Sequence, residues 1–144
     1  AARLAALSPE ARAAFEEDLG RWAGYAHGTG VADIAMRGNA RAELVVARME
    51  WWHGRPPVPC WSRELADREA ASIADLLTFV VSSGARVVNM SWMRAKASYL
   101  GNLAACAPHL GADERDRLAQ YSVDTIRAVL RAGMASAPHV LFVG

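Results

Sequence analysis

The stretch that decides the fold is residues 86–91, Arg-Val-Val-Asn-Met-Ser. It is short, apolar and partly β-branched, which predicts a buried strand. A helix pattern precedes it, beginning after the capping residue Ser62 and ending at Gly84. The apolar side chains of that helix recur at helical spacing. They are Leu65, Ile73, Leu76, Leu77 and Val80.

The same alternation continues on both sides of this strand. Residues 92–110 are irregular, with a helical turn expected around residues 100–107, and a further helix is expected from Asp113 to Gly133. Strands are predicted at residues 44–49 and 139–143. Strands alternating with helices predict an α/β fold, in which a parallel sheet is joined by right-handed crossover helices.

The first forty residues predict two helices. Ser8-Pro9-Glu10 combines a capping hydroxyl, a first-turn proline and an acid near the positive end of the helix dipole. We expect this helix to stop at Gly20. Residues 27–36 are interpreted as a loop turning into a short buried helix that ends near residues 38–39. Small residues in that helix would let neighbouring backbone come close.

The composition is that of one globular domain without an internal boundary. Hydrophobic residues make up 53% of the 144 residues and charged residues 22%, and the formal net charge is +1. This charge is too small to favour nucleic acid or an anionic membrane as a partner. No stretch is apolar enough to span a bilayer, so no membrane span is expected. The chain begins without methionine or a signal-peptide pattern, so we expect it to start inside a longer protein.

Two cysteines, Cys60 and Cys106, make neither a disulfide framework nor a zinc site. They can pair with each other, but two unpaired thiols are the favoured interpretation. No His-Glu-x-x-His or paired-cysteine motif indicates metal binding. His53, His109 and His139 have no neighbouring motif and are interpreted as structural or exposed.

Several segments, in order, resemble subtilisin-like serine proteases. Residues 27–32, His-Gly-Thr-Gly-Val-Ala, are similar to the His-Gly-Thr-His-Val-Ala segment of the family. Residues 38–48 resemble the turn and strand after the histidine helix, and residues 87–91 resemble the Val-Ile-Asn-Met-Ser strand. Residues 140–144 resemble the strand that leads into the Ala-Ala-Gly-Asn stretch. The resemblance covers residues 25–144.

The resemblance implies that residues 1–144 are part of a three-layer subtilisin-like peptidase domain. The part runs from the histidine segment to the strand before the asparagine of the oxyanion hole. It implies a serine endopeptidase that works through an acyl-enzyme, with His27 as the catalytic base and acid. Imidazole suits this role because it titrates near neutral pH. The aspartate would lie before Ala1, and the serine and the oxyanion asparagine after Gly144.

The resemblance also implies that Ser91, Trp92 and Met93 line a strand edge that pairs with an extended substrate. The alternative is that these residues only end a strand and that Trp92 packs in a core. The implied partners are a peptide or protein substrate and the remainder of the same catalytic domain. No cofactor is expected from the residues, and calcium and secretion are expectations from the family alone.

The sequence departs from the family pattern at three places. Gly30 stands where the family has a second histidine, Asp33 where it has a glycine, and residues 92–94 replace Leu-Gly-Gly. A buried carboxylate at Asp33 would need a partner or water. These departures motivate one alternative, a protease-like binding or scaffold module without catalysis. A further alternative is an unrelated α/β domain in which the histidine motif occurs by chance. With two triad members absent, we expect this chain alone to hydrolyse no peptide or ester.

Overall fold

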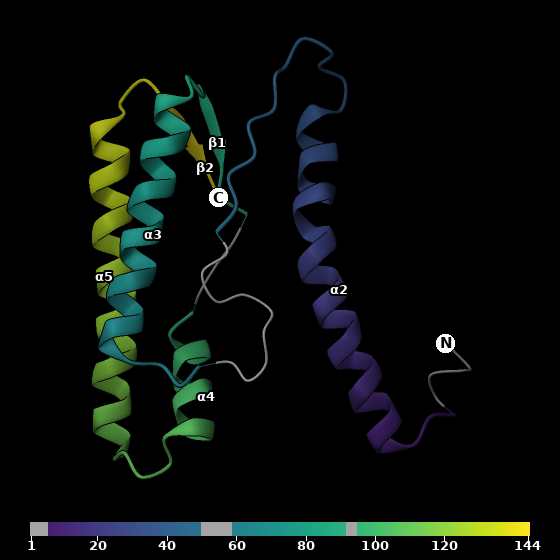
Figure 1. The fold of residues 1–144 in the computed structure, drawn as a ribbon, viewed down its shortest axis with the longest axis vertical. Coiled ribbons are helices and arrows are strands. Elements are labelled where there is room, and N and C mark those ends of the chain that lie inside the picture. Colours follow the sequence, from purple (N-terminus) through teal and green to yellow (C-terminus); the bar gives the residue numbers. More distant parts are fainter. Residues whose placement is uncertain (1–5, 50–58, 92–94) are drawn as a thin grey trace. The chain divides into compact units, whose positions relative to one another are not determined.

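The computed structural model describes residues 6–49, 59–91 and 95–144, shown as coloured ribbon in Figure 1. The chain divides into two compact units, Ala1–Leu44 and Val45–Gly144. The described residues of the first unit contain helix α2 (Pro9–Met36). The second contains, in order, α3 (Arg63–Ser82), β1 (Val87–Asn89), α4 (Lys96–Cys106), α5 (Ala112–Ser136) and β2 (Leu141–Val143).

Helix α2 begins where the sequence predicts. The Ser8 side chain accepts a hydrogen bond from the backbone N–H of Ala11 at 3.2 Å, and Pro9 occupies the first turn. The pKa of Glu10 lies below its ordinary value of 4.5, because the carboxylate accepts hydrogen bonds from its own backbone N–H and from Ser8. The start of α2 therefore has both a neutral cap and a stabilised negative charge.

The predicted stop of α2 at Gly20 is wrong. The helix runs on to Met36 and ends at Arg37, followed by Gly38 with φ +81°. A glycine inside a helix costs only about 1 kcal/mol, and α2 contains no proline after Pro9 that would break it. Residues 27–36 therefore continue one long helix, and the expected short buried helix is absent.

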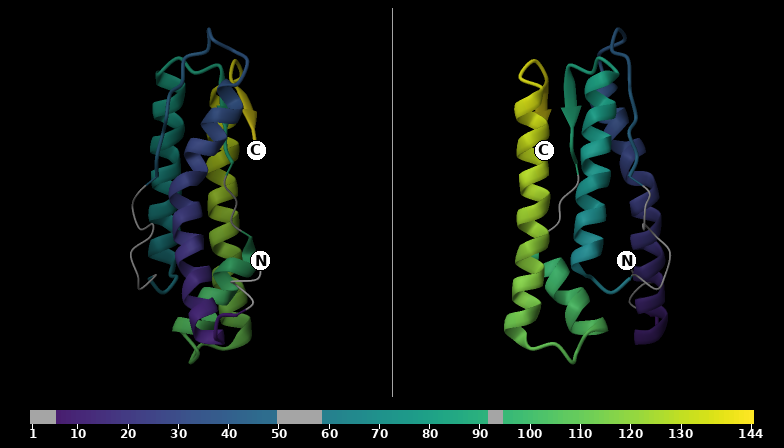
Figure 2. Two further views of the ribbon diagram at one scale, coloured as in Figure 1. Left: turned by 90° about the vertical axis from the view of Figure 1, so that its right-hand side faces the viewer. Right: turned by 60° about the vertical axis from the view of Figure 1, so that its left-hand side comes forward.

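The second unit is built on α3 and α5, which run side by side in the same direction (Figures 1 and 2). Helix α3 confirms the expected caps, since the Ser62 side chain accepts from the Leu65 N–H at 3.2 Å and Gly84 has φ +80°. Helix α5 continues past Gly133, where its end was wrongly expected. A Cβ added at Gly133 would collide with the Leu77 side chain. This glycine therefore permits the close contact of the two helices.

The strands β1 and β2 pair in parallel, with Val87 opposite Leu141 and Asn89 opposite Val143. Both strands lie within predicted segments, although each has only three residues. The connection between them consists of α4 and α5, as a parallel pair requires a long crossover. The structure is therefore mostly helical with a small two-stranded parallel sheet.

The predicted strand at residues 44–49 does not form. Residues 42–49 have no regular secondary structure, and Leu44, Val45 and Val46 are all exposed. An apolar run becomes a strand only when another strand edge accepts its backbone hydrogen bonds. Between residues 59 and 91 and between 95 and 144, β1 and β2 pair only with each other.

The core of the second unit lies between the helices and one face of the strand pair. Its largest cluster includes Trp61, Leu77, Tyr99, Leu103 and Ile126. A second cluster joins Val80 of α3 to Val88 of β1 and to Val140. The side chains on the opposite face of the strands are exposed. They are Val87, Leu141 and Val143.

Candidate functional site

The ends of β1 and β2 lie side by side. The backbone N–H of Met90 donates to the carbonyl of Val143 at 2.7 Å, which extends the pairing one residue beyond β1. Ser91 follows, exposed, and its hydroxyl accepts a hydrogen bond from the Asn89 side chain at 2.8 Å. The carboxyl edge of a parallel sheet is where ligands bind in open α/β folds. Ser91 therefore lies at the edge where a substrate strand was expected.

Two of the three predicted substrate-binding residues, Trp92 and Met93, lie outside the described residues. Ser91 is thus the described member of this set. It directly follows the 87–90 segment, and its hydroxyl is oriented by Asn89. What the structure provides at this edge is an exposed polar residue that follows a strand buried on one face only.

His27 lies in the interior of α2 and is exposed. The expectation that His27 stands at the entrance of a helix is wrong, because helix α2 begins eighteen positions earlier at Pro9. The ring is carried by a surface helix position. His27 belongs to the first unit and Ser91 to the second, so the structure defines no distance between them.

The departures from the family pattern near His27 lie on the helix surface. Asp33 forms an exposed ion pair with Arg37, one helical turn later. The Asp33 carboxylate therefore has a partner and is exposed. The expectation that it lies buried in a small-residue helix is wrong. A Cβ added at Gly28 or Gly30 would meet nothing within 4 Å in the part of the chain that the structure describes. These glycines do not mark a close backbone approach.

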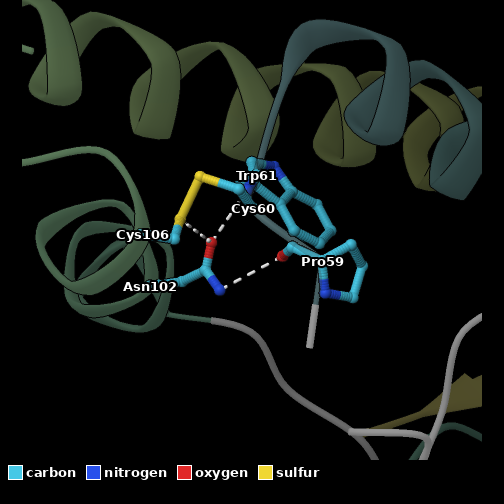
Figure 3. The surroundings of a disulfide bond; sticks show 5 residues. All are labelled: Pro59, Cys60, Trp61, Asn102 and Cys106. Atoms are coloured by element: carbon cyan, nitrogen blue, oxygen red, sulfur yellow. Dashed lines mark hydrogen bonds between the residues drawn. A yellow bond between two sulfur atoms is a disulfide. The ribbon is translucent and has the colours of Figure 1, made fainter. Parts of the chain in front are cut away.

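Cys60 and Cys106 form a disulfide with a Cα–Cα distance of 5.5 Å (Figure 3). The favoured interpretation as two unpaired thiols is wrong. The sequence holds only two cysteines, so the signal was present, but their proximity depends on α4 folding back onto the segment before α3. Disulfides persist in oxidising compartments.

Asn102 reinforces the disulfide from α4. Its side-chain oxygen accepts from the Trp61 backbone N–H at 2.8 Å, and its amide nitrogen donates to the Pro59 carbonyl at 3.2 Å (Figure 3). One side chain thus binds the backbone on both sides of Cys60. A segment without regular secondary structure is held by a covalent bond and two hydrogen bonds. Sequence reasoning gave no role to Asn102, because no pattern marks such a long-range contact.

Polar side chains are buried in the core beside the Asn102 clamp, by which we mean the Cys60–Cys106 disulfide together with the two Asn102 hydrogen bonds. The indole N–H of Trp61 donates to the Ser122 hydroxyl at 2.6 Å, and Tyr99 donates to the Glu69 carboxylate at 3.3 Å. Glu69 and Ser122 are both fully buried. The Trp61 and Tyr99 rings lie 4.8 Å apart. This network ties the segment before α3 to α4 and α5, and buried polar networks of this kind favour one arrangement of a core.

The remaining candidate residues gather into no site. His109 and His139 are exposed on turns, and His53 lies outside the described residues. Within residues 6–49, 59–91 and 95–144, no three His, Cys, Asp or Glu side chains cluster in a way that would hold a metal ion. None of the helices described here has the length and apolar character needed to cross a membrane.

Comparison with protein-family models, with curated proteins and with solved structures gave no match.

Proposed function

We propose that this chain is part of a subtilisin-like serine endopeptidase that cleaves peptide bonds through an acyl-enzyme. His27 is the general base and acid, and Ser91, Trp92 and Met93 form the strand that pairs with the substrate. The proposed whole is a three-layer domain, of which the α3, α5, β1 and β2 arrangement is a part. Peptide or protein is the substrate class, and the rest of the catalytic domain is the structural partner.

One observation carries the proposal. The 87–91 and 140–144 segments, which each resemble a strand of the family, lie next to each other in parallel register, with Val88 opposite Phe142. Parallel pairing agrees with the type of sheet that the alternation of strands and helices predicts. It leaves Ser91 exposed at the carboxyl ends of the strands, which is the place we propose for an extended peptide.

The proposed chemistry needs three groups. The hydroxyl of a serine attacks the scissile carbonyl carbon while His27 takes its proton, and His27 then returns that proton to the leaving amine. An aspartate orients the ring. The family motifs for the aspartate and the serine have no counterpart in this sequence, so both come from the remainder of the protein. The disulfide is compatible with the secretion that the family suggests.

The test replaces His27 by Ala in the intact parent protein and measures peptide cleavage. Loss of the catalytic base is expected to lower kcat by at least about a thousandfold with a small change in KM. His139→Ala is the matched control, because His139 is also exposed and belongs to no motif. Unchanged turnover in His27→Ala would eliminate the proposed role.

A second function, a binding module without catalysis, is favoured by the position of His27. A histidine inside a long helix, with the Asp33–Arg37 pair on the same helix, is an ordinary surface residue. Such a module would bind an extended peptide along Ser91 and release it uncut. Peptide binding that survives His27→Ala, in a parent that cleaves nothing, would select this function over the endopeptidase.

A further inference from the structure

A pocket of about 580 Å³ lies in the second unit, beside the carboxyl ends of the strands. Met90, which follows β1, and Phe142 of β2 form one wall. The facing wall comes from α5, and the buried side chains of Tyr99 and Ile126 lie at its base. The volume falls within the range of small-molecule sites.

The lining is apolar and adaptable. Val123, Leu130 and Met134 share one face of α5 with each other, and Met90 faces them from the strand side. Unbranched methionine side chains adjust to flexible ligands better than rigid aromatic or branched ones do. The walls therefore fit an aliphatic chain.

Two arginines of α5, Arg127 and Arg131, add positive charge to this lining, and both are exposed. Arg127 already pairs with Asp124 at 3.2 Å. For Arg131, no carboxylate partner occurs among the residues that the structure describes. Among the residues that the structure describes, Arg131 is thus the lining cation without an ion-pair partner, and a planar guanidinium binds a carboxylate through two parallel hydrogen bonds.

From these observations we propose that the pocket binds an alkyl carboxylate, with its chain between α5 and the strands and its carboxylate on Arg131. The Arg131 guanidinium favours a carboxylate, and the apolar walls favour an unbranched chain. This site uses neither His27 nor Ser91, so the proposal is independent of peptidase activity.

The test titrates monomeric dodecanoate into the full chain and measures binding by calorimetry. One site per chain is expected. Arg131→Ala should weaken binding about tenfold or more, since it removes a charge-assisted interaction. Arg117→Ala is the matched control, because it removes the same charge from the same helix outside the pocket. Circular dichroism verifies that each variant is folded.

Two further measurements distinguish binding in the pocket from non-specific binding of dodecanoate to the protein surface. Dodecanol, which has the same chain and no charge, should bind about tenfold more weakly than dodecanoate. Met134→Trp fills the pocket and should abolish binding of both. Equal affinity for dodecanol, equal loss in Arg117→Ala and Arg131→Ala, or no binding at all would overturn the proposal. If the chain forms a dimer that does not bind dodecanoate and is not dissociated by it, the pocket belongs to an interface with a second copy of the chain. That result would also overturn the proposal.

Discussion

At the scale of the residue, Ser122 shows how one hydroxyl fixes a core. It is fully buried, accepts from the Trp61 indole at 2.6 Å and donates to the Leu118 carbonyl at 3.0 Å. Ser122→Ala removes the acceptor of a buried N–H, so the free energy of unfolding should fall by about 1–3 kcal/mol. Urea unfolding followed by tryptophan fluorescence measures this loss.

Ser136→Ala is the control for this prediction. Ser136 is also in α5, but it is exposed and its hydroxyl donates to the Gly133 carbonyl of its own helix. Its replacement should change stability by less than about 0.5 kcal/mol. Equal effects at the two serines would show that the buried hydrogen bond contributes nothing specific.

At the same scale, Gly133 sets the distance between α3 and α5. Gly133→Val would force the new side chain into Leu77, which is itself buried, and should destabilise the second unit by about 1–3 kcal/mol. Gly101→Val is the matched control, because a Cβ at Gly101 in α4 meets nothing within 4 Å in the described part of the chain. Thermal unfolding compares the two. In a Leu77→Ala background the cost at Gly133 should shrink, and a cost that stays constant would contradict the contact.

At the scale of the element, the Cys60–Cys106 bond joins α4 to the segment before α3 across 46 residues of sequence. Cys106→Ser should lower the free energy of unfolding by about 2–4 kcal/mol, because the open chain gains entropy when it unfolds. Thermal melts with and without dithiothreitol measure this. Wild-type protein should respond to the reductant and Cys106→Ser should not. If dithiothreitol leaves the unfolding temperature of the wild-type protein unchanged, the disulfide is absent or does not stabilise the fold.

The elements differ in how far the sequence determines them. Local signals suffice for the starts of α2 and α3, since Ser8 and Ser62 cap their helices through contacts only three residues away. The prediction that α2 ends at Gly20 is wrong, because a helix tolerates single glycines. The prediction of a strand at residues 44–49 is wrong, because a strand forms only where the edge of another strand accepts its backbone hydrogen bonds. Such a partner edge lies far away in sequence, so the local pattern does not report it.

The candidate site is predictable to the same limited extent. The 86–91 and 139–143 segments identify the strand pair, and the register then places Ser91 at the carboxyl edge. The position of His27 was not predictable from its motif, because a six-residue resemblance does not fix where a helix begins. The Asn102 clamp and the pocket at Arg131 depend on contacts between elements that no local pattern reports.

At the scale of the whole molecule, the two units differ in how they bury apolar surface. Both core clusters belong to the second unit. Among residues 6–20, 22–23 and 26–44 of the first unit, no side chain is fully buried, and Phe15, Leu19 and Trp22 are exposed at helical spacing on α2. A helix gains most of its stability from a packed apolar face. We therefore expect the cooperative unfolding transition of the chain to come mainly from the second unit.

The strand pair is the part of the second unit most exposed to association. Parallel sheets are ordinarily covered on both faces, yet Val87, Leu141 and Val143 are exposed on one face of β1 and β2. Open edges and apolar faces promote self-association, so we expect the isolated chain to be oligomeric. Leu141→Lys places a charge in this face and should shift the chain toward monomer in sedimentation velocity.

Phe79→Lys tests whether the strand face, rather than added charge, causes that shift. Phe79 is a half-exposed apolar residue of α3, and its exposed fraction of 50% is close to the 61% of Leu141. Both variants add one positive charge and remove one apolar side chain. If association runs through the strands, only Leu141→Lys dissociates the oligomer, because a charge buried between two sheet faces lacks both water and a partner. Equal dissociation by both variants, or a monomeric wild-type chain with a sharp cooperative melt, would mean that the exposed strand face does not drive assembly.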